Sequence, residues 1–146
     1  MTLLALLLAA LMGTVPAPPP AAPDPVAVLH AWDDARAEAW ATADPPALRR
    51  LYTSDSAAGA ADVAMLRAWR ERGLRVERLR MQVLSVVVRS QERHRLVLVV
   101  RDRVAAAVAV GDGVRRSLPH DEVSTRRLVL VRVAGEWRVR WVADRY

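Results

Sequence analysis

The sequence predicts one α+β domain in which three N-terminal helices cover an antiparallel sheet. Two Asp-Pro pairs, Asp24-Pro25 and Asp44-Pro45, each combine an acidic N-cap with a proline at the first helical position, which is typical of a helix start. After Gly73, alternating and β-branched apolar residues indicate strands. Such a sheet has to bury its apolar face, and the helices are the available cover, so the two halves are expected to pack together.

The first helix is predicted at residues 25–42. Arg36 lies within its apolar stripe, four residues from each of two tryptophans. His30, Asp33 and Asp34 fall on or near the opposite side. The apolar stripe itself consists of Val28, Leu29, Trp32, Ala35, Ala39 and Trp40.

Two shorter helices follow. The second begins at Pro45 and has an apolar edge that ends at Leu51 and Tyr52. Residues 53–59 are small and polar and are expected to form a loop. The third helix is predicted at residues 60–72, and Gly73 is placed to end it in a left-handed conformation.

The second half of the chain reads as a meander of strands. In the final strand, apolar Trp137, Val139 and Trp141 alternate with Arg138 and Arg140, which predicts a half-buried strand with a solvated arginine face. The strands are predicted at residues 76–88, 94–104, 114–118, 123–133 and 137–143, with turns at 89–93, 111–113 and 134–136 and a loop at 119–122.

Composition narrows the classes of protein to consider. A chain of 146 residues suits a single domain, and the absence of cysteine excludes disulfides, a thiol nucleophile, thiolate metal sites and lipid-modified cysteine anchors. The formal charge is +6, and arginine supplies all 22 basic residues. A positive surface attracts anionic partners, but the arginines are scattered over many elements without interleaved aromatics, so no specific nucleic-acid site is predicted.

Residues 2–15 form an uncharged apolar segment. The segment is shorter than the roughly 20 residues of a membrane span and matches the apolar core of a secretory signal, although no basic leader precedes it. We therefore expect residues 1–15 to be a signal or anchor, residues 16–24 a proline-rich linker and residues 25–146 the folded domain. The alternative is an apolar helix that packs on the domain or on another subunit.

The order of apolar landmarks suggests a family. Residues 25–143 contain Trp32, Trp40, Asp44, Leu48, Leu51-Tyr52 and the helix end Arg72-Gly73-Leu74, followed by the strands. This order resembles the nuclear transport factor 2-like superfamily, in particular its small exported or membrane-tethered actinobacterial members of unknown function. The resemblance implies a cone, in which a strongly curved antiparallel sheet wraps around helices and encloses a pocket. Many members carry a β-hairpin between the second and third helices, where this chain has only the loop 53–59.

Enzymes of this superfamily use acids, His and Tyr in an apolar pocket, so the resemblance directs attention to such residues. Asp102 is the best catalytic candidate, because strand alternation points it toward the apolar side. A buried carboxylate needs a partner, and Arg36 is a candidate; a structural Arg–Asp pair is the simpler interpretation. The Tyr52 hydroxyl either points into the pocket or reaches solvent from a ring that packs in the core. The pocket candidates are Trp32, Arg36, Tyr52 and Asp102.

Other polar residues give weaker signals. His94 starts a strand beside a turn and is expected to be exposed, and the loop residues His120-Asp121-Glu122 do not converge on one point. The sequence shows no His/Asp/Glu spacing specific for a metal and no phosphate loop, and it predicts no cofactor.

We expect a non-catalytic module, secreted or anchored at the outer face of the cytoplasmic membrane through its N-terminal segment alone, that binds a small apolar ligand or an envelope protein. Two alternatives stay open. One is an isomerase, dehydratase or cyclase that uses Asp102. The other is a structural module that forms a homodimer through its sheet.

Overall fold

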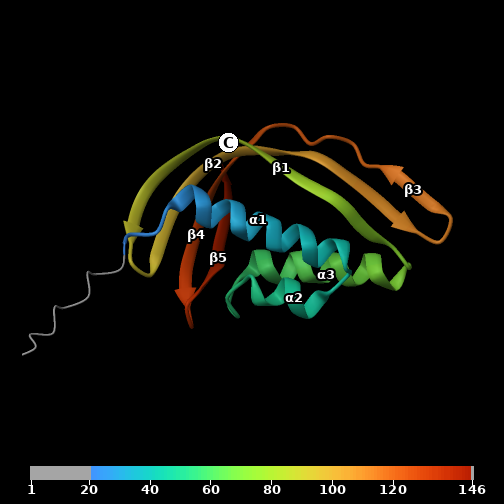
Figure 1. Cartoon of the computed structure of the whole chain (residues 1–146), viewed down its shortest axis with the longest axis horizontal. Coiled ribbons are helices and arrows are strands. Elements are labelled where there is room, and N and C mark those ends of the chain that lie inside the picture. Colours follow the sequence, from blue (N-terminus) through green and yellow to red (C-terminus); the bar gives the residue numbers. More distant parts are fainter. Residues whose placement is uncertain (1–20, 146) are drawn as a thin grey trace, which may run out of the picture.

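The structure, a computed structural model, describes residues 21–145. Within this range the chain forms three helices followed by five strands of one antiparallel sheet (Figure 1). The helices are α1 (Pro25–Ala41), α2 (Pro45–Arg50) and α3 (Ala57–Glu71). The strands are β1 (Arg75–Glu92), β2 (Arg95–Gly111), β3 (Val114–Ser117), β4 (Ser124–Val133) and β5 (Glu136–Arg145).

Side-chain caps set the helix starts. The carboxylate of Asp24 accepts hydrogen bonds from the backbone N–H groups of Val26 and Ala27, and Asp44 caps α2 in the same way. The third helix begins three residues earlier than predicted, because Ser56 serves as its N-cap through a hydrogen bond from the Gly59 N–H. The expected loop at residues 53–59 is therefore shorter.

The sheet has the order β1-β2-β4-β5, and β3 pairs with the end of β2. Both long strands exceed their predicted length. The polar residues 90–92 pair with the start of β2 and leave a turn of two residues, Arg93 and His94, so the predicted turn at residues 89–93 is wrong. At the other end, the small apolar residues 105–110 continue β2 alongside β1, and residues 108–111 also pair with β3.

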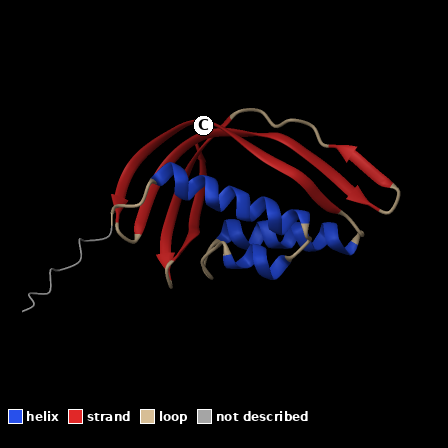
Figure 2. Ribbon diagram, viewed as in Figure 1, coloured by secondary structure: helices blue, strands red, loops and turns tan. Residues whose placement is uncertain are grey.

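Figure 2 shows one curved layer of strands with the three helices on its concave side. Four register shifts along the β1–β2 pair produce much of this curvature, since a bulge bends its strand. Arg78 sits at one of these shifts with a φ of 55°. Helix α1 runs beneath the arch of β1 and β2, and α2 and α3 lie beyond it (Figure 1).

The core lies between the concave face and the helices. On the first half of β2 the even-numbered Leu96, Leu98 and Val100 join this core, so the odd-numbered residues between them face the other side of the sheet. Leu29 of α1 and Leu66 of α3 are fully buried against this layer. Burying one such side chain stabilises the fold by roughly 1.5–3 kcal/mol. The predicted α+β class, with three helices packed on a strongly curved antiparallel sheet, is confirmed.

Part of the predicted domain plan lies outside the described residues. This applies to the signal or anchor at residues 1–15 and to most of the linker. In residues 21–145, none of the helices combines the length and apolar character needed to cross a membrane. The extracytoplasmic location therefore stays a prediction.

Candidate functional site

A cavity of about 640 Å³ lies between α1, α3 and the concave face of the sheet. The four predicted pocket residues, Trp32, Arg36, Tyr52 and Asp102, all line it. They come from α1, from the connection between α2 and α3, and from β2. The fold therefore brings the candidates together, while their role in ligand binding stays a prediction.

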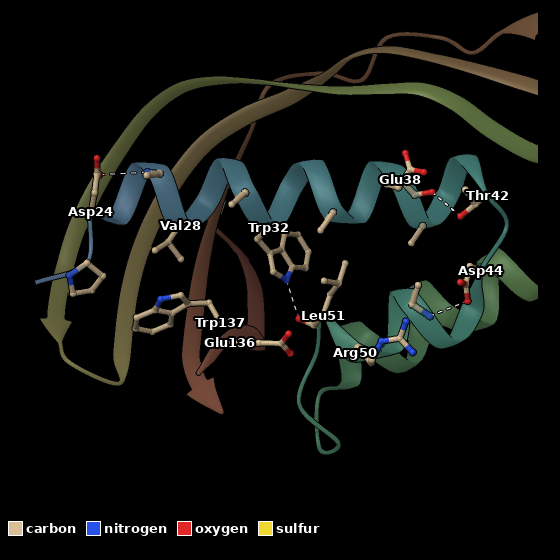
Figure 3. Close-up of a pocket in the computed structure, with 16 residues that line it drawn as sticks. Asp24, Val28, Trp32, Glu38, Thr42, Asp44, Arg50, Leu51, Glu136 and Trp137 are labelled. Atoms are coloured by element: carbon tan, nitrogen blue, oxygen red, sulfur yellow. Dashed lines mark hydrogen bonds between the residues drawn. The ribbon is translucent and has the colours of Figure 1, made fainter. Parts of the chain in front are cut away.

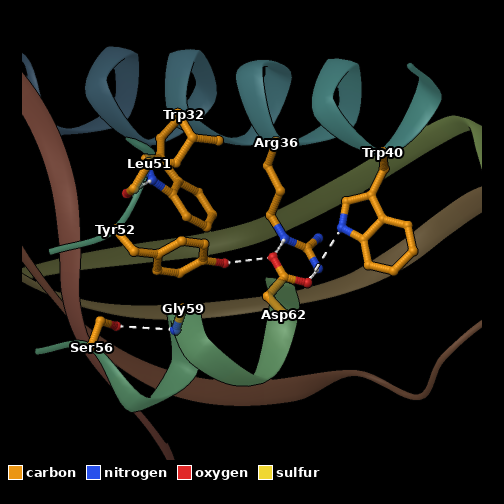
Figure 4. Close-up of polar contacts among 8 residues, drawn as sticks. All are labelled: Trp32, Arg36, Trp40, Leu51, Tyr52, Ser56, Gly59 and Asp62. Atoms are coloured by element: carbon orange, nitrogen blue, oxygen red, sulfur yellow. Dashed lines mark hydrogen bonds and ion pairs between the residues drawn. The ribbon is translucent and has the colours of Figure 1, made fainter. Parts of the chain in front are cut away.

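One carboxylate, Asp62 of α3, organises the helix side of this cavity (Figure 4). Nε and Nη2 of Arg36 donate to its two oxygens at 2.7 Å each. The Tyr52 hydroxyl donates to Oδ2 at 2.7 Å, and Nε1 of Trp40 donates to Oδ1 at 3.3 Å. Asp62 is only 7% exposed. Four donors thus share one buried carboxylate, which satisfies it and ties α1 and the α2–α3 connection to α3.

The network fixes the protonation of its members. Burial alone would lower the pKa of Arg36, but the hydrogen bond and the negative charge of Asp62 raise it above its ordinary value. Burial raises the pKa of Tyr52 well above its usual range, and the charge of Asp62 adds to this effect. Arg36 therefore remains a cation and Tyr52 remains a neutral donor at physiological pH.

Asp102 faces the same cavity and is 1% exposed. The expected pairing of Asp102 with Arg36 is wrong, because the Arg36 guanidinium already pairs with Asp62. Arg126 of the adjacent strand β4 pairs with Asp102 instead; its Nε donates to both carboxylate oxygens at 3.1 Å, and its Nη2 donates to Oδ2. Asp102 lies opposite Ser124, so Arg126 is the next inward-facing residue along β4 and reaches it diagonally.

Asp33 lies on the side of α1 opposite the apolar stripe, and it is not left to solvent. The curved sheet wraps around the helix and covers more than one of its faces, so Asp33 is half-buried beside Leu79 and Met81 of β1. Its Oδ2 is buried and accepts no hydrogen bond from the described residues. Burial is the main cause that raises the pKa of Asp33 to about 6, and the charge of Asp102 adds to it against the opposing effect of Arg126.

A wider groove of about 970 Å³ follows the other side of α1 (Figure 3). Its walls are α2 and the β4–β5 hairpin, which contributes Trp137. Trp32 lies in its floor, where its Nε1 donates to the Leu51 carbonyl at 2.8 Å. The sequence signal for this groove was a row of alanines every fourth residue, namely Ala27, Ala31, Ala35 and Ala39.

The weaker candidates do not meet. His94 lies exposed in the β1–β2 turn, as expected. In the β3–β4 loop, Asp121 and Glu122 line the cavity but His120 does not. Within residues 21–145, no group of three or more His, Asp or Glu side chains is placed to hold a metal ion.

Sequence reasoning missed Asp62 and Arg126. Both carried a periodic signal. Asp62 lies four residues before Leu66 on the buried face of α3, and Arg126 alternates with Leu128 and Leu130 on the inner face of β4. Each was overlooked because a charged residue is normally assigned to solvent unless its partner is known.

Comparison with known proteins supports the fold but no particular function, ligand or partner. No family model and no curated protein matches the chain. The protein Aln2 from a Streptomyces species is similar in structure, with 15% identity, coverage of 85% of this chain and 93% of Aln2, and a TM-score of 0.56. A Catenulispora acidiphila protein in complex with S-DNPA aligns with 14% identity over 82% of this chain and 90% of that chain, at a TM-score of 0.53.

A Rhodospirillum rubrum protein, described as NTF2-like and of unknown function in nutrient uptake, shares 21% identity over 81% of this chain and 98% of its own, at a TM-score of 0.48. The likeness to Aln2 and to the Catenulispora acidiphila protein shows the fold alone, with helices held within a curved antiparallel sheet.

Proposed function

We propose that this domain is a non-catalytic module that binds a small, neutral, largely apolar ligand with a carbonyl group in the cavity between α1, α3 and the sheet. The observation that carries the proposal is the set of hydrogen bonds that the two arginines of the cavity make and leave unmade. Arg36 and Arg126 both line the cavity, and each uses Nε and Nη2 to bind its carboxylate. Neither Nη1 makes a hydrogen bond within the described residues, so both are available to a carbonyl oxygen.

The cavity lining favours a neutral ligand. Apolar side chains of Met65, Met81, Val104 and Val142 supply walls for an apolar body. Five acidic residues and three arginines line the cavity, so a ligand carboxylate would meet an excess of negative charge. A carbonyl accepts hydrogen bonds without adding a charge.

The buried acids favour binding over catalysis. A general base has to reach the proton that it removes. Asp62 is occupied by four donors, Asp102 is held by Arg126 at both oxygens, and Asp33, whose unpaired oxygen is buried, does not line this cavity. The enzyme alternative requires Asp102 to leave Arg126, and turnover of a steroid-like enone or a polyketide-type substrate that Asp102→Asn abolishes would establish it.

A titration with camphor, a rigid apolar ketone, tests the proposal by ¹H–¹⁵N NMR on the full chain. We expect saturable shifts at the Nε–H groups of Arg36 and Arg126. Ala61→Phe, which fills the cavity from α3, should weaken binding by about tenfold or more, or about 1.4 kcal/mol. Ala64→Phe is the matched control, because Ala64 is exposed on the same helix and lines none of the hollows described above.

Camphorate, which places carboxylates on a related skeleton, should bind more weakly than camphor. The proposal fails if camphor produces no saturable shift up to its solubility limit. It also fails if the shifts map to the groove of Figure 3, or if Ala61→Phe and Ala64→Phe bind alike.

The location outside the cytoplasm, and an envelope protein as a further partner, belong to the same proposal. They rest on the apolar segment at residues 2–15 and the proline-rich residues that follow it. A fusion of residues 1–25 to a reporter that is active only after export tests the location, and a silent fusion contradicts it.

A further inference from the structure

A separate pocket of about 320 Å³ lies where the end of α2, the start of α3 and β5 meet. We infer that this pocket binds a phosphate-type oxyanion. Three arginines, Arg49, Arg50 and Arg138, line it, and no acidic residue does. The inference is independent of the ligand proposed for the larger cavity, because the two hollows share only Tyr52.

Arg138 of β5 provides the first indication of a ligand. Its Nε is buried and makes no hydrogen bond within residues 21–145. Its Nη2 reaches only the exposed Glu136, at 3.6 Å. A buried N–H without an acceptor destabilises a fold, and a guanidinium edge is shaped for two oxygens of one oxyanion. A phosphate oxygen in this pocket would satisfy the Nε–H.

The start of α3 provides the second indication (Figure 4). Ser56 caps the helix by accepting from the Gly59 N–H at 3.2 Å, and the Ala60 N–H bonds the Ser56 carbonyl. Ser56, Gly59 and Ala60, at the start of this 15-residue helix, line the pocket together with the arginines, so the positive end of the helix dipole borders it.

The pocket wall is polar and close to the backbone. Thr53, Ser54 and Ser56 place hydroxyl groups along it. Gly59 brings the backbone of α3 against the Tyr52 ring, since a Cβ there would meet that ring at 2.5 Å. The neighbouring carboxylate of Asp55 is engaged elsewhere, by the Thr53 hydroxyl at 2.6 Å and by Arg140 at 3.1 Å. The charges of Arg49 and Arg50, which form no ion pair within the described residues, are thus left for an anion.

A titration of the full chain with inorganic phosphate, against chloride at equal ionic strength, tests the inference by NMR. We expect saturable shifts at the amides of Gly59 and Ala60 and at the Nε–H of Arg138. Arg138→Gln and Arg49→Gln should each weaken phosphate binding by about tenfold or more. Arg67→Gln is the control, because Arg67 is exposed on α3 outside the pocket and removes the same charge.

The source of the phosphate group is resolved by two further arms. Glycerol phosphate presents a soluble monoester, and vesicles of phosphatidate in phosphatidylcholine present the same group in a membrane. Binding of glycerol phosphate alone assigns a soluble ligand, and co-sedimentation with phosphatidate vesicles that Arg138→Gln abolishes assigns a lipid headgroup. The inference is overturned if millimolar phosphate gives no saturable shift, or if Arg67→Gln loses as much affinity as Arg138→Gln.

Discussion

Among residues 21–145, Asp62 accepts more side-chain hydrogen bonds than any other polar residue. It binds Arg36 through two hydrogen bonds and accepts one more from each of Tyr52 and Trp40. An ion pair of this kind adds little over an apolar replacement, but removing one partner leaves a desolvated charge behind. The energetic importance of Asp62 therefore appears when it is mutated alone.

Asp62→Asn should lower the free energy of unfolding by about 3 kcal/mol, the lower end of the range for a broken buried pair, because the Arg36 side chain is 24% exposed. Urea denaturation monitored by tryptophan fluorescence measures this change. Asp55→Asn is the control, since Asp55 and Arg140 are exposed and their pair should leave the urea midpoint unchanged. Equal effects of the two substitutions would contradict the prediction.

Asp33→Asn should stabilise the domain, increasingly so as the pH rises. The pKa of Asp33 is about 6 in the folded state against 3.8 for the free side chain. Below the lower value the group is neutral in both states and has no effect. Above pH 6 the folded chain holds a buried charge, and a difference of about two pKa units corresponds to about 3 kcal/mol.

Urea denaturation at a series of pH values measures this effect. The stability difference between Asp33→Asn and the unmodified chain should grow between about pH 4 and pH 7 and then level off. Asp34→Asn, at the exposed neighbouring position on α1, is the control. A difference for Asp33→Asn that does not change with pH would show that the carboxyl is not perturbed in this way.

Residue-level prediction from sequence succeeded for position and failed for pairing. Trp32, Arg36, Tyr52 and Asp102 were placed correctly on the inner side, because strand and helix periods determine direction. The partners were not accessible in this way. Which arginine meets which carboxylate depends on strand order and on the approach of α3, and both are set by contacts distant in sequence.

At the level of elements, the close contact between α3 and the α2–α3 connection depends on Gly59. Gly59→Ala would normally stabilise a helix by about 1 kcal/mol through propensity. Here the new Cβ meets Cβ and Cγ of Tyr52 at 2.5 Å, so α3 has to shift. The Tyr52–Asp62 hydrogen bond would be disturbed by that shift.

We expect Gly59→Ala to destabilise the domain by about 1–3 kcal/mol, the usual result of overpacking, when thermal or urea unfolding is measured. Ala64→Gly, at an exposed position of the same helix, isolates the propensity effect and should cost about 1 kcal/mol. A stabilised Gly59→Ala variant would show that Tyr52 and α3 move apart at little energetic cost.

Element boundaries were predictable where a local signal exists. The Asp-Pro pairs fixed the starts of α1 and α2, and Gly73, with a φ of 69°, ends the last turn of α3. The start of α3 was missed because Ser56 was assigned to a polar loop, although its side chain caps the helix. The ends of β1 and β2 were missed because pairing within the hairpin continues both strands through polar and small residues. The residue pattern of one strand alone does not reveal such pairing.

At the level of the whole molecule, the convex face of the sheet combines apolar and basic character. Val87 and Trp141 are 46% and 47% exposed there. Arg101 and Arg127 lie on neighbouring strands of the same face, and neither forms an ion pair within the described residues. A second copy on this face would bury apolar surface but bring like charges together.

We therefore predict that homodimer formation through this face depends on salt. Sedimentation velocity should show monomers at low ionic strength and association at high ionic strength, where the arginine charges are screened. Trp141→Ser should reduce the association at high salt, and Trp137→Ser, on the inner side of the same strand, is the control. Dimers at low salt would contradict the prediction, and monomers in all conditions would exclude the dimerisation module.

The four hydrogen bonds to Asp62 also bear on how fast the chain folds and unfolds. Their donors sit on α1 and just after α2, and their acceptor sits on α3, so each bond joins two separate segments and the full set requires three segments to dock. We expect these hydrogen bonds to form late in folding, with φ-values near zero at Asp62. Asp62→Asn would then accelerate unfolding and leave the folding rate almost unchanged.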